Sequence, residues 1–454
     1  MIKFLKALKE SGDWKTLLFH SSWSLTLTAG LSYGMGMLRD RIFAQTFGLS
    51  RTLDIYNAAF VIPDMMLGVL VGTALSAAFV PIFTKLYDEK KSLGYAYAHQ
   101  MITWGVTLIV TIGIVVAIFL PSFAHLLVPG FEGEDLKQYI LLTRVMLLSP
   151  ILFTLSNSYG RILISVKEFF WWGLSPALYN LGIIIGVLFL VPRFGMLGLV
   201  LGTLFGVLLH LANRFAPLKR KKYGFRNKID FTFSSEMGET VKLMLPKIFQ
   251  YSMWFILLMV FTNVASKLPE GSIAAYNYAR NFQSLPVSLL GIAISMAMYP
   301  VLSHDAGKGN YKKFRNDFKR NRFKLIVYTV LAAIALGILS RFVVSLLLGG
   351  GAFGANDIHL VSMTLILYCF TIPLESLMHC YHRAFYSLRN TITPSVIHVG
   401  IIFLVIGAVT WLAPVIGVYA IPVSFACGTF VQIVLLAILF PGLLEKRERL
   451  SLQE

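Results

Sequence analysis

Residues 72–81 read GTALSAAFVP, and residues 291–300 read GIAISMAMYP. Both stretches fit the pattern GxAxSxAxxP, in which small residues recur along an otherwise apolar segment. Small residues in this arrangement let transmembrane helices approach one another closely. One copy lies in each half of the chain, so the pair indicates an internal repeat.

A second pair of matched stretches supports this repeat. Each contains a tyrosine, an arginine, a serine and a further basic residue at identical spacing, namely Tyr159, Arg161, Ser165 and Lys167 in one half and Tyr381, Arg383, Ser387 and Arg389 in the other. Both pairs lie six expected membrane spans apart. The two halves therefore have the same expected orientation in the membrane and form a parallel repeat.

The composition makes lipid the expected surroundings of most of the surface. Of the 454 residues, 56% are hydrophobic and 14% are charged, which a soluble domain of this size could not hide in its core. We expect an all-α polytopic membrane protein of about twelve transmembrane helices, in two pseudo-symmetric six-helix lobes, because a span needs about 20 apolar residues. The expected spans are 16–38, 53–85, 98–128, 137–164, 168–192, 195–216, 237–266, 272–304, 322–348, 357–387, 391–413 and 415–441.

The connections between these spans alternate in charge. Basic residues gather in 85–91, 219–228, 308–324, 383–389 and the C-terminal tail, whereas 129–135, 266–272 and 349–357 are neutral or acidic. The positive-inside rule then places both termini in the cytoplasm. We expect an N-terminal lobe at 1–218, a basic cytoplasmic linker at 219–236 and a C-terminal lobe at 237–454. The net charge of +18 is thus assigned to topology and membrane lipids, and no nucleic-acid partner is expected.

Ionisable residues near or within the spans are the candidates for function, because burying one in lipid costs about 2.5–3.5 kcal/mol. Arg39, Asp40 and Arg41 lie on the expected outer side, where basic residues are disfavoured. Asp54 and Arg280 also lie toward that side. Since basic residues outnumber acids among the intramembrane candidates, we expect a cationic interior suited to an anionic head group such as a pyrophosphate.

Glu375 and His379 stand one helical turn apart, on one face of an expected span. Together they could relay a proton or hold a cation, and a buried, mutually satisfied pair is the alternative. Asp64 is a further intramembrane carboxylate considered for ion coupling. The sequence shows no metal-ligand spacing and no phosphate-cradling loop, so we expect a transporter rather than an enzyme, with no cofactor and with any metal unassigned.

The run Leu38-Arg39-Asp40-Arg41-Ile42-Phe43-Ala44, followed by Phe47-Gly48, Asp54, Pro63 and Ala78-Phe79-Val80-Pro81, resembles the MurJ/MviN family of lipid II flippases. The stretch from Phe385 to Pro394 is similar to that family too. The resemblance implies a multidrug/oligosaccharidyl-lipid/polysaccharide transporter fold, with two lobes around a central cavity that opens alternately to each side of the bacterial cytoplasmic membrane.

What the resemblance implies about the site is carried over residue by residue. Arg39 and Asp54 match family cavity positions, so Arg39 and Arg280 would hold the phosphates and Asp54 would order the guanidinium groups. Asn390, which neighbours Thr393, stands where the family commonly has an aspartate associated with sodium coupling. Other positions depart from the family, since Tyr33, Leu67 and Gly72 replace charged residues.

The expected function is therefore translocation of an undecaprenyl-pyrophosphate-linked saccharide, the peptidoglycan precursor lipid II, by a monomeric flippase coupled to a sodium or proton gradient. Two alternatives remain open at this point. One is an ion-coupled exporter of amphiphilic small molecules on the same fold, which should have an acidic cavity. The other is a transport-inactive membrane scaffold.

Overall fold

A computed structural model of the protein describes residues 21–72, 79–220 and 223–451. Within these ranges every regular element is a helix, and no strand is present. Eight of the described helical stretches are long and apolar enough to cross a membrane, and one of them, Ile392–Arg449, contains two successive helices. Every expected span overlaps a helical stretch, so the all-α polytopic fold is confirmed.

The chain divides into two compact units. Unit 1 comprises Met1–Phe43, Ile55–Leu126 and Phe131–Phe255, and unit 2 comprises Ala44–Asp54, Leu127–Gly130 and Ile256–Glu454. Two short segments of the first half of the chain therefore belong to unit 2. Along the chain, the last change of unit falls at Phe255, beyond the linker expected at 219–236.

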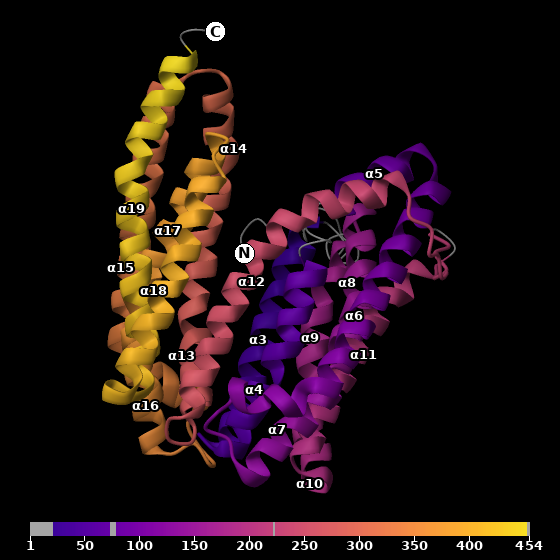
Figure 1. The fold of residues 1–454 in the computed structure, drawn as a ribbon, viewed down its shortest axis with the longest axis vertical. Helices are drawn as coiled ribbons and strands as arrows, with labels where there is room; N and C mark the ends of the chain where they lie inside the picture. Colours follow the sequence, from indigo (N-terminus) through magenta and orange to yellow (C-terminus); the bar gives the residue numbers. More distant parts are fainter. Residues whose placement is uncertain (1–20, 73–78, 221–222, 452–454) are drawn as a thin grey trace, which may run out of the picture. The chain divides into compact units, whose positions relative to one another are not determined.

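The helices of the first half are coloured indigo to magenta in Figure 1. In chain order they are α3 (Ser21–Phe47), α4 (Arg51–Met66), the π-helix η1 (Leu67–Gly72), α5 (Val80–Glu89), α6 (Lys91–Leu127), α7 (Gly133–Met146), α8 (Leu148–Ser165), α9 (Phe169–Ile185), the π-helix η3 (Gly186–Leu190), α10 (Val191–Phe194) and α11 (Met196–Leu218).

The second half repeats the order of the main helices. It contains α12 (Ser235–Ser266), α13 (Ser272–Pro286), the π-helix η4 (Val287–Ile292), α14 (Ala293–Gly307), α15 (Tyr311–Leu348), α16 (Ala355–Cys369), α17 (Thr371–Ser387), α18 (Ile392–Ile416), the 3-10 turn η5 (Gly417–Tyr419) and α19 (Ala420–Ser451). Within unit 2, α15, α17, α18 and α19 run side by side, and α17 packs against both α15 and α19 (Figure 1).

Two equivalent helix ends confirm the internal repeat. Among the described residues, Lys167 and Arg389 are the non-glycine residues with positive φ, at 64° and 55°. In each case the next amide bonds back to the fifth carbonyl before it, Glu168 to Leu163 and Asn390 to Phe385. This is the Schellman ending of a helix, in which the left-handed residue is usually glycine. α8 and α17 thus end in the same way.

The GxAxSxAxxP motifs also begin in equivalent structure. The π-helix η1 ends at Gly72, the first residue of the first motif, and η4 contains Gly291, the first residue of the second. A π-helical turn inserts a residue into the ladder of helix hydrogen bonds and often marks a functional position. Ser76 lies outside the described residues. Ser295 is buried.

Glycines bring α9 and η3, which continues it, into direct backbone contact with α11. A Cβ atom at Gly182 would lie 2.2 Å from the Cα of Gly206, and one at Gly202 would lie 2.4 Å from the Cα of Gly186. Any side chain at these positions would have to separate the two helices. This seam fixes α9, which carries one of the site residues described below.

The expected linker packs on unit 1 as an extended segment. The hydroxyl of Tyr95 on α6 donates to the backbone oxygen of Tyr223 at 2.8 Å, and the amide of Asp230 donates to Thr103 at 3.0 Å. The hydroxyl and the amide of Thr232 both donate to the Asp230 carboxylate, which lowers the pKa of that carboxyl below its ordinary value.

These contacts explain why the change of unit lies inside α12. A freely moving linker would leave its backbone groups to water, whereas this segment is held by side chains of α6 along its length. The hydroxyl of Thr240, near the start of α12, also pairs with Tyr97 of α6 at 2.7 Å. The first turns of α12 therefore belong to unit 1.

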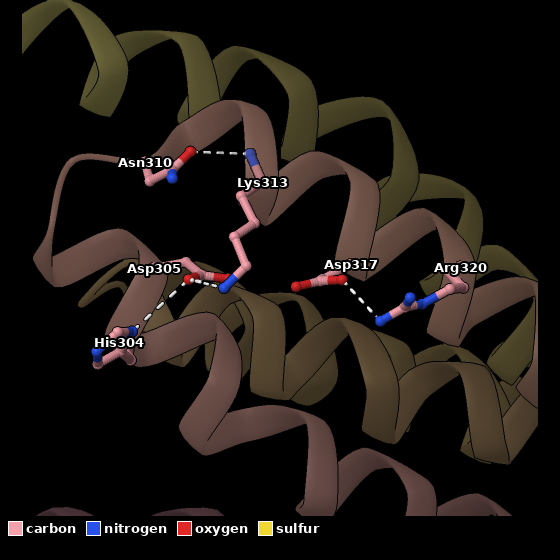
Figure 2. A network of polar contacts seen from close by, with 6 residues as sticks. All are labelled: His304, Asp305, Asn310, Lys313, Asp317 and Arg320. Carbon is pink, nitrogen blue, oxygen red and sulfur yellow. Dashed lines mark hydrogen bonds and ion pairs between the residues drawn. The ribbon is translucent and has the colours of Figure 1, made fainter.

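The basic connection expected at 308–324 is mostly helical. α15 begins at Tyr311, and Asn310 caps it by accepting a hydrogen bond from the amide of Lys313 at 3.1 Å. Figure 2 shows the Lys313 ammonium reaching back to the buried carboxylate of Asp305 at the end of α14, 2.9 Å away. The ion pair closes the corner between α14 and α15.

Candidate functional site

Arg39 lies near the C-terminal end of α3, and two side chains of unit 1 hold its guanidinium group. Its Nε and Nη2 atoms donate to Asp40 Oδ1 at 3.0 and 2.7 Å, and Nη1 donates to the side-chain oxygen of Asn180 on α9 at 3.0 Å. The Arg39 and Asp40 side chains are 25% and 18% exposed. The ion pair is therefore accessible from one side.

Arg39 retains hydrogen-bonding capacity. A guanidinium group carries five N–H donors, and Asp40 and Asn180 engage one on each nitrogen. The other two donors have no acceptor within the part of the chain that the structure describes. Planar donors of this kind match the paired oxygens of a phosphate.

Asn180 is the contact that the sequence analysis missed. It is buried on α9 in an otherwise apolar run, where an amide must find a polar partner to offset its desolvation. The amide in an apolar helix was the signal that could have drawn attention to it. The sequence does not say which partner it finds.

Acidic groups accompany Arg39 in unit 1. Asp64 on α4 is exposed, and the hydroxyls of Tyr56 and Tyr179 interact electrostatically with both Asp64 and Arg39. With Asp40, two carboxylates thus share this region with one guanidinium. This balance describes the surroundings of Arg39 alone, and the cationic interior expected from the sequence stays a prediction. Arg41, on the next position of α3, has an exposed side chain.

Asp54 has a different role from the one expected. Its side chain is fully buried, and its Oδ2 and Oδ1 atoms accept hydrogen bonds from the amides of Gly271 at 2.7 Å and Ala274 at 2.8 Å. These amides open α13, so Asp54 caps that helix where its unsatisfied N–H groups and its dipole favour a negative charge. Arg51 adds an attractive charge. The expected role of ordering cavity guanidinium groups gives way to capping.

Arg280 lies on α13 in unit 2 and is half-buried. It interacts electrostatically with the hydroxyls of Tyr276 and Tyr368, and the Tyr276 hydroxyl pairs with Thr262 at 2.9 Å. Arg39 and Arg280 thus belong to different units, each with its own tyrosines.

Glu375 on α17 is held from α13. The side-chain nitrogen of Gln283 donates to Glu375 Oε2 and to the Thr371 hydroxyl, both at 2.9 Å. Glu375 and His379 do interact electrostatically, as their spacing on one helical face predicts. Beyond His379, a further buried group of polar side chains lies between α17, α18 and α19.

Asn390 and Thr393 contact each other at the start of α18. The Asn390 side chain donates to the Thr393 hydroxyl at 3.0 Å and accepts from the Thr393 amide at 3.1 Å. This is a helix-capping arrangement. It follows directly on Arg389, the left-handed residue that ends α17.

A buried arginine in unit 1 was also missed. Arg214 on α11 is 4% exposed and donates to Asn157 Oδ1 at 2.7 Å and to the Ser175 hydroxyl at 3.0 Å. Neutral oxygens thus solvate this charge, and the charge of Arg161 lies close enough to repel it. Arg214 ties α8, α9 and α11 together. Because Arg214 lies near the end of an expected span, the sequence alone does not distinguish it from the basic residues that set the orientation in the membrane.

No cluster of three or more histidine, cysteine, aspartate or glutamate side chains able to hold a metal ion occurs among the described residues. The polar groups around Arg39 in unit 1 instead suit hydrogen bonding to an anionic ligand, and those around His379 in unit 2 suit proton exchange.

Comparisons with known proteins place these features in context. The family model described as lipid II flippase MurJ matches residues 43–449. A probable lipid II flippase MurJ from Aquifex aeolicus is 27% identical over 415 residues, which cover 90% of this chain and 80% of that protein.

Two solved structures share the fold. A lipid II flippase MurJ in an inward closed conformation matches with a TM-score of 0.79 at 23% identity, over 94% of this chain and 90% of the other. An inward-facing multidrug resistance MATE family transporter of the MOP superfamily matches with a TM-score of 0.75 at 13% identity, over 92% and 95%.

Proposed function

Because this chain belongs to the MurJ family of lipid II flippases, we propose that it translocates an undecaprenyl-pyrophosphate-linked saccharide, lipid II, across the bacterial cytoplasmic membrane by alternating access. The fold supports a transporter: it is all-helical, built of apolar spans and internally duplicated. The peptidoglycan precursor would pass its head group through the protein while its polyprenyl tail stays in lipid.

The observation that carries this proposal is the arrangement around Arg39. Its guanidinium group is held in place by Asp40 and Asn180, is partly exposed, and keeps two donors for a ligand. A pyrophosphate can take those donors and then displace Asp40, since it offers more negative charge in the same geometry. Asn180 would keep the guanidinium plane oriented during the exchange.

Asp40 has a matching role in the empty state. A guanidinium in a hydrophobic body costs free energy unless a carboxylate or a ligand accompanies it. Asp40 would supply that charge when no substrate is bound and give way when a phosphate arrives. The bound and empty states would then both be stable enough for the protein to cycle.

The test is genetic rescue. In a host depleted of its own lipid II flippase, the wild-type gene should restore growth and the appearance of lipid II in the outer leaflet, whereas Arg39→Ala should restore neither. Arg41→Ala, an exposed neighbour on α3, is the matched control and should rescue. Failure of the wild-type protein to rescue at normal membrane levels would overturn the proposal. Export of amphiphilic cations by that same protein would favour the exporter alternative.

A further inference from the structure

Two histidines of unit 2 are joined through one glutamine. The side-chain nitrogen of Gln432 on α19 lies 3.2 Å from Nε2 of His382 on α17, and its oxygen lies 3.3 Å from Nδ1 of His398 on α18. The two imidazole rings are perpendicular, with centroids 6.0 Å apart. His382 is 8% exposed and Gln432 is 1% exposed.

The chemistry of the amide fixes the protonation state of both rings. An amide nitrogen only donates and an amide oxygen only accepts. In the observed orientation, His382 Nε2 must therefore be an unprotonated acceptor, and His398 Nδ1 must carry the proton that the Gln432 oxygen accepts. One glutamine thus sets the tautomers of two histidines on two other helices.

A proton added to His382 cannot be accommodated without a rearrangement. Protonated Nε2 is a donor and would face the donating nitrogen of Gln432, so the amide must turn over to offer its oxygen. Its nitrogen then faces His398 Nδ1, which must become an acceptor and leave the ring proton on Nε2. One proton has been gained, and every hydrogen bond of the bridge is kept.

A second proton has no such solution. A proton on His398 alone is compatible with the observed orientation, and a proton on His382 alone is compatible with the reversed one. With both rings protonated, one N–H group must face the amide nitrogen in either orientation. The three side chains therefore accommodate a single proton, in two arrangements that differ in the direction of the bridge.

Other ionisable groups face this bridge. On α17, His379 and Arg383 interact electrostatically with His382. Glu375 interacts in the same way with His379. The Tyr386 ring lies 6.0 Å from the His382 ring. From α14, the Tyr299 ring lies 5.6 Å beneath Arg383, and from α15, Arg322 donates to the neighbouring Tyr381 of α17. Glu375 and Gln283 extend the polar path toward α13.

We propose that His382, Gln432 and His398 form a single-proton binding site in unit 2, whose occupation couples substrate movement to a proton gradient. The inference rests on the proposed function for its coupling and on the bridge geometry for the site itself. Imidazole is suited to this because each of its ring nitrogens can bind or release a proton. The bridge links three helices, so reversing it changes contacts between α17, α18 and α19 together.

The site is tested first without transport. Purified full-length protein is moved between pH 8 and pH 5.5, and proton uptake is measured with an indicator dye for wild type, for His125→Gln and for the double variant His382→Gln/His398→Gln. His125 is an exposed histidine of α6 and serves as the matched control. The double variant should lose the one proton that the bridge binds, whereas either histidine alone should still bind it. Bridge uptake that persists in the double variant would overturn the site.

The coupling is tested in vesicles that contain lipid II, with a pH gradient, a sodium gradient or neither. A pH gradient should drive wild-type transport, and both His382→Gln/His398→Gln and Gln432→Leu should lose that response while keeping gradient-free equilibration. If Gln432→Leu does not fold, Gln432→Glu serves as a second variant. Its carboxylate still accepts a hydrogen bond from an imidazolium ion, but it lacks the donating nitrogen of the glutamine side chain. A wild-type protein that takes up the proton but moves no lipid II would refute the proposed function and leave the site. A pH-gradient response that persists in His382→Gln/His398→Gln would refute the coupling.

Discussion

The Oδ2 atom of Asp54 lies 2.7 Å from the amide nitrogen of Gly271, although 217 positions separate the two residues in the chain. The carboxylate joins the segment between the first two helices to the start of α13. The backbone oxygen of Ser50, which precedes α4, accepts hydrogen bonds from the amides of Leu53 and Asp54. Asp54 therefore lies in the first turn of one helix of unit 2, and its carboxylate caps the start of another.

Asp54→Ala should lower the free energy of unfolding by about 1.5–3 kcal/mol, because buried amides of α13 lose a charged acceptor. Asp54→Asn should lose less, since its oxygen still serves one of the two amides. Thermal unfolding in detergent measures both variants. Asp64→Asn is the control and should melt like wild type, because Asp64 is exposed. Equal melting of Asp54→Ala and wild type would remove the capping role.

Arg39→Ala should weaken lipid II binding about tenfold to a hundredfold, equivalent to the loss of about 1.5–3 kcal/mol from charge-assisted hydrogen bonds. Arg39→Lys should recover only part of this, since an ammonium lacks the planar fork. Binding of a fluorescent lipid II to purified protein is the measurement. Arg41→Ala should bind normally. Wild-type affinity in Arg39→Ala would show that this residue does not contact the substrate.

Lys167→Gly should be more stable than Lys167→Ala by about 1 kcal/mol, because alanine keeps the Cβ atom that disfavours the left-handed conformation. Neither variant retains the positive charge, so the comparison isolates the backbone. Arg389→Gly and Arg389→Ala should differ by a similar amount if the two helix ends are equivalent. Apparent melting temperatures decide this, and a difference at one site alone would count against equivalence.

Gly202→Ala should destabilise the protein by about 1–3 kcal/mol, since the added methyl group has no space between α11 and Gly186 of η3. It should also reduce lipid II binding, because the seam positions Asn180 beside Arg39. Gly34→Ala on α3 is the control, as a Cβ atom there meets nothing within 4 Å. A Gly202→Ala protein as stable as Gly34→Ala would mean that the helices separate at little cost.

The proposed orientation in the membrane predicts which surfaces an impermeant thiol reagent can reach. In a variant without the natural Cys369, Cys380 and Cys427, Gly224→Cys and Lys308→Cys should resist labelling in intact cells, because their basic surroundings are expected to be cytoplasmic. Glu132→Cys, in an acidic connection, should be labelled. The reverse pattern would invert the topology.

The fold could be predicted because its signals are local and repeated. Apolar length predicts spans, and residues such as Tyr159 and Arg161 recur at the same interval as Tyr381 and Arg383. The order of the main helices from α3 to α11 is repeated from α12 to α19, as that interval requires. The predicted ends of the helices were wrong where a helix continues through charged sequence. The span expected at 322–348, for example, is part of α15, which begins at Tyr311.

The partners within the site could not be predicted in the same way. Asn180 and Gln432 were each visible as single amides in apolar sequence, which indicates that a partner exists but does not identify it. Which residue they meet depends on how each helix is rotated and how closely it packs. Asp54 was recognised as unusual, yet a carboxylate suits an arginine and a helix beginning equally well.

The membership of Ala44–Asp54 and Leu127–Gly130 in unit 2 bears on how such a gene could be divided. The simplest outcome of a gene duplication is two halves that fold when expressed as separate polypeptides. In this protein, a second-half fragment beginning at Ile256 would lack Asp54 and leave the amides of Gly271 and Ala274 without their acceptor. Dividing the gene between the halves would thus place Ala44–Asp54 and Leu127–Gly130 on a different polypeptide from the rest of unit 2, and the second fragment could complete its fold only by binding the first.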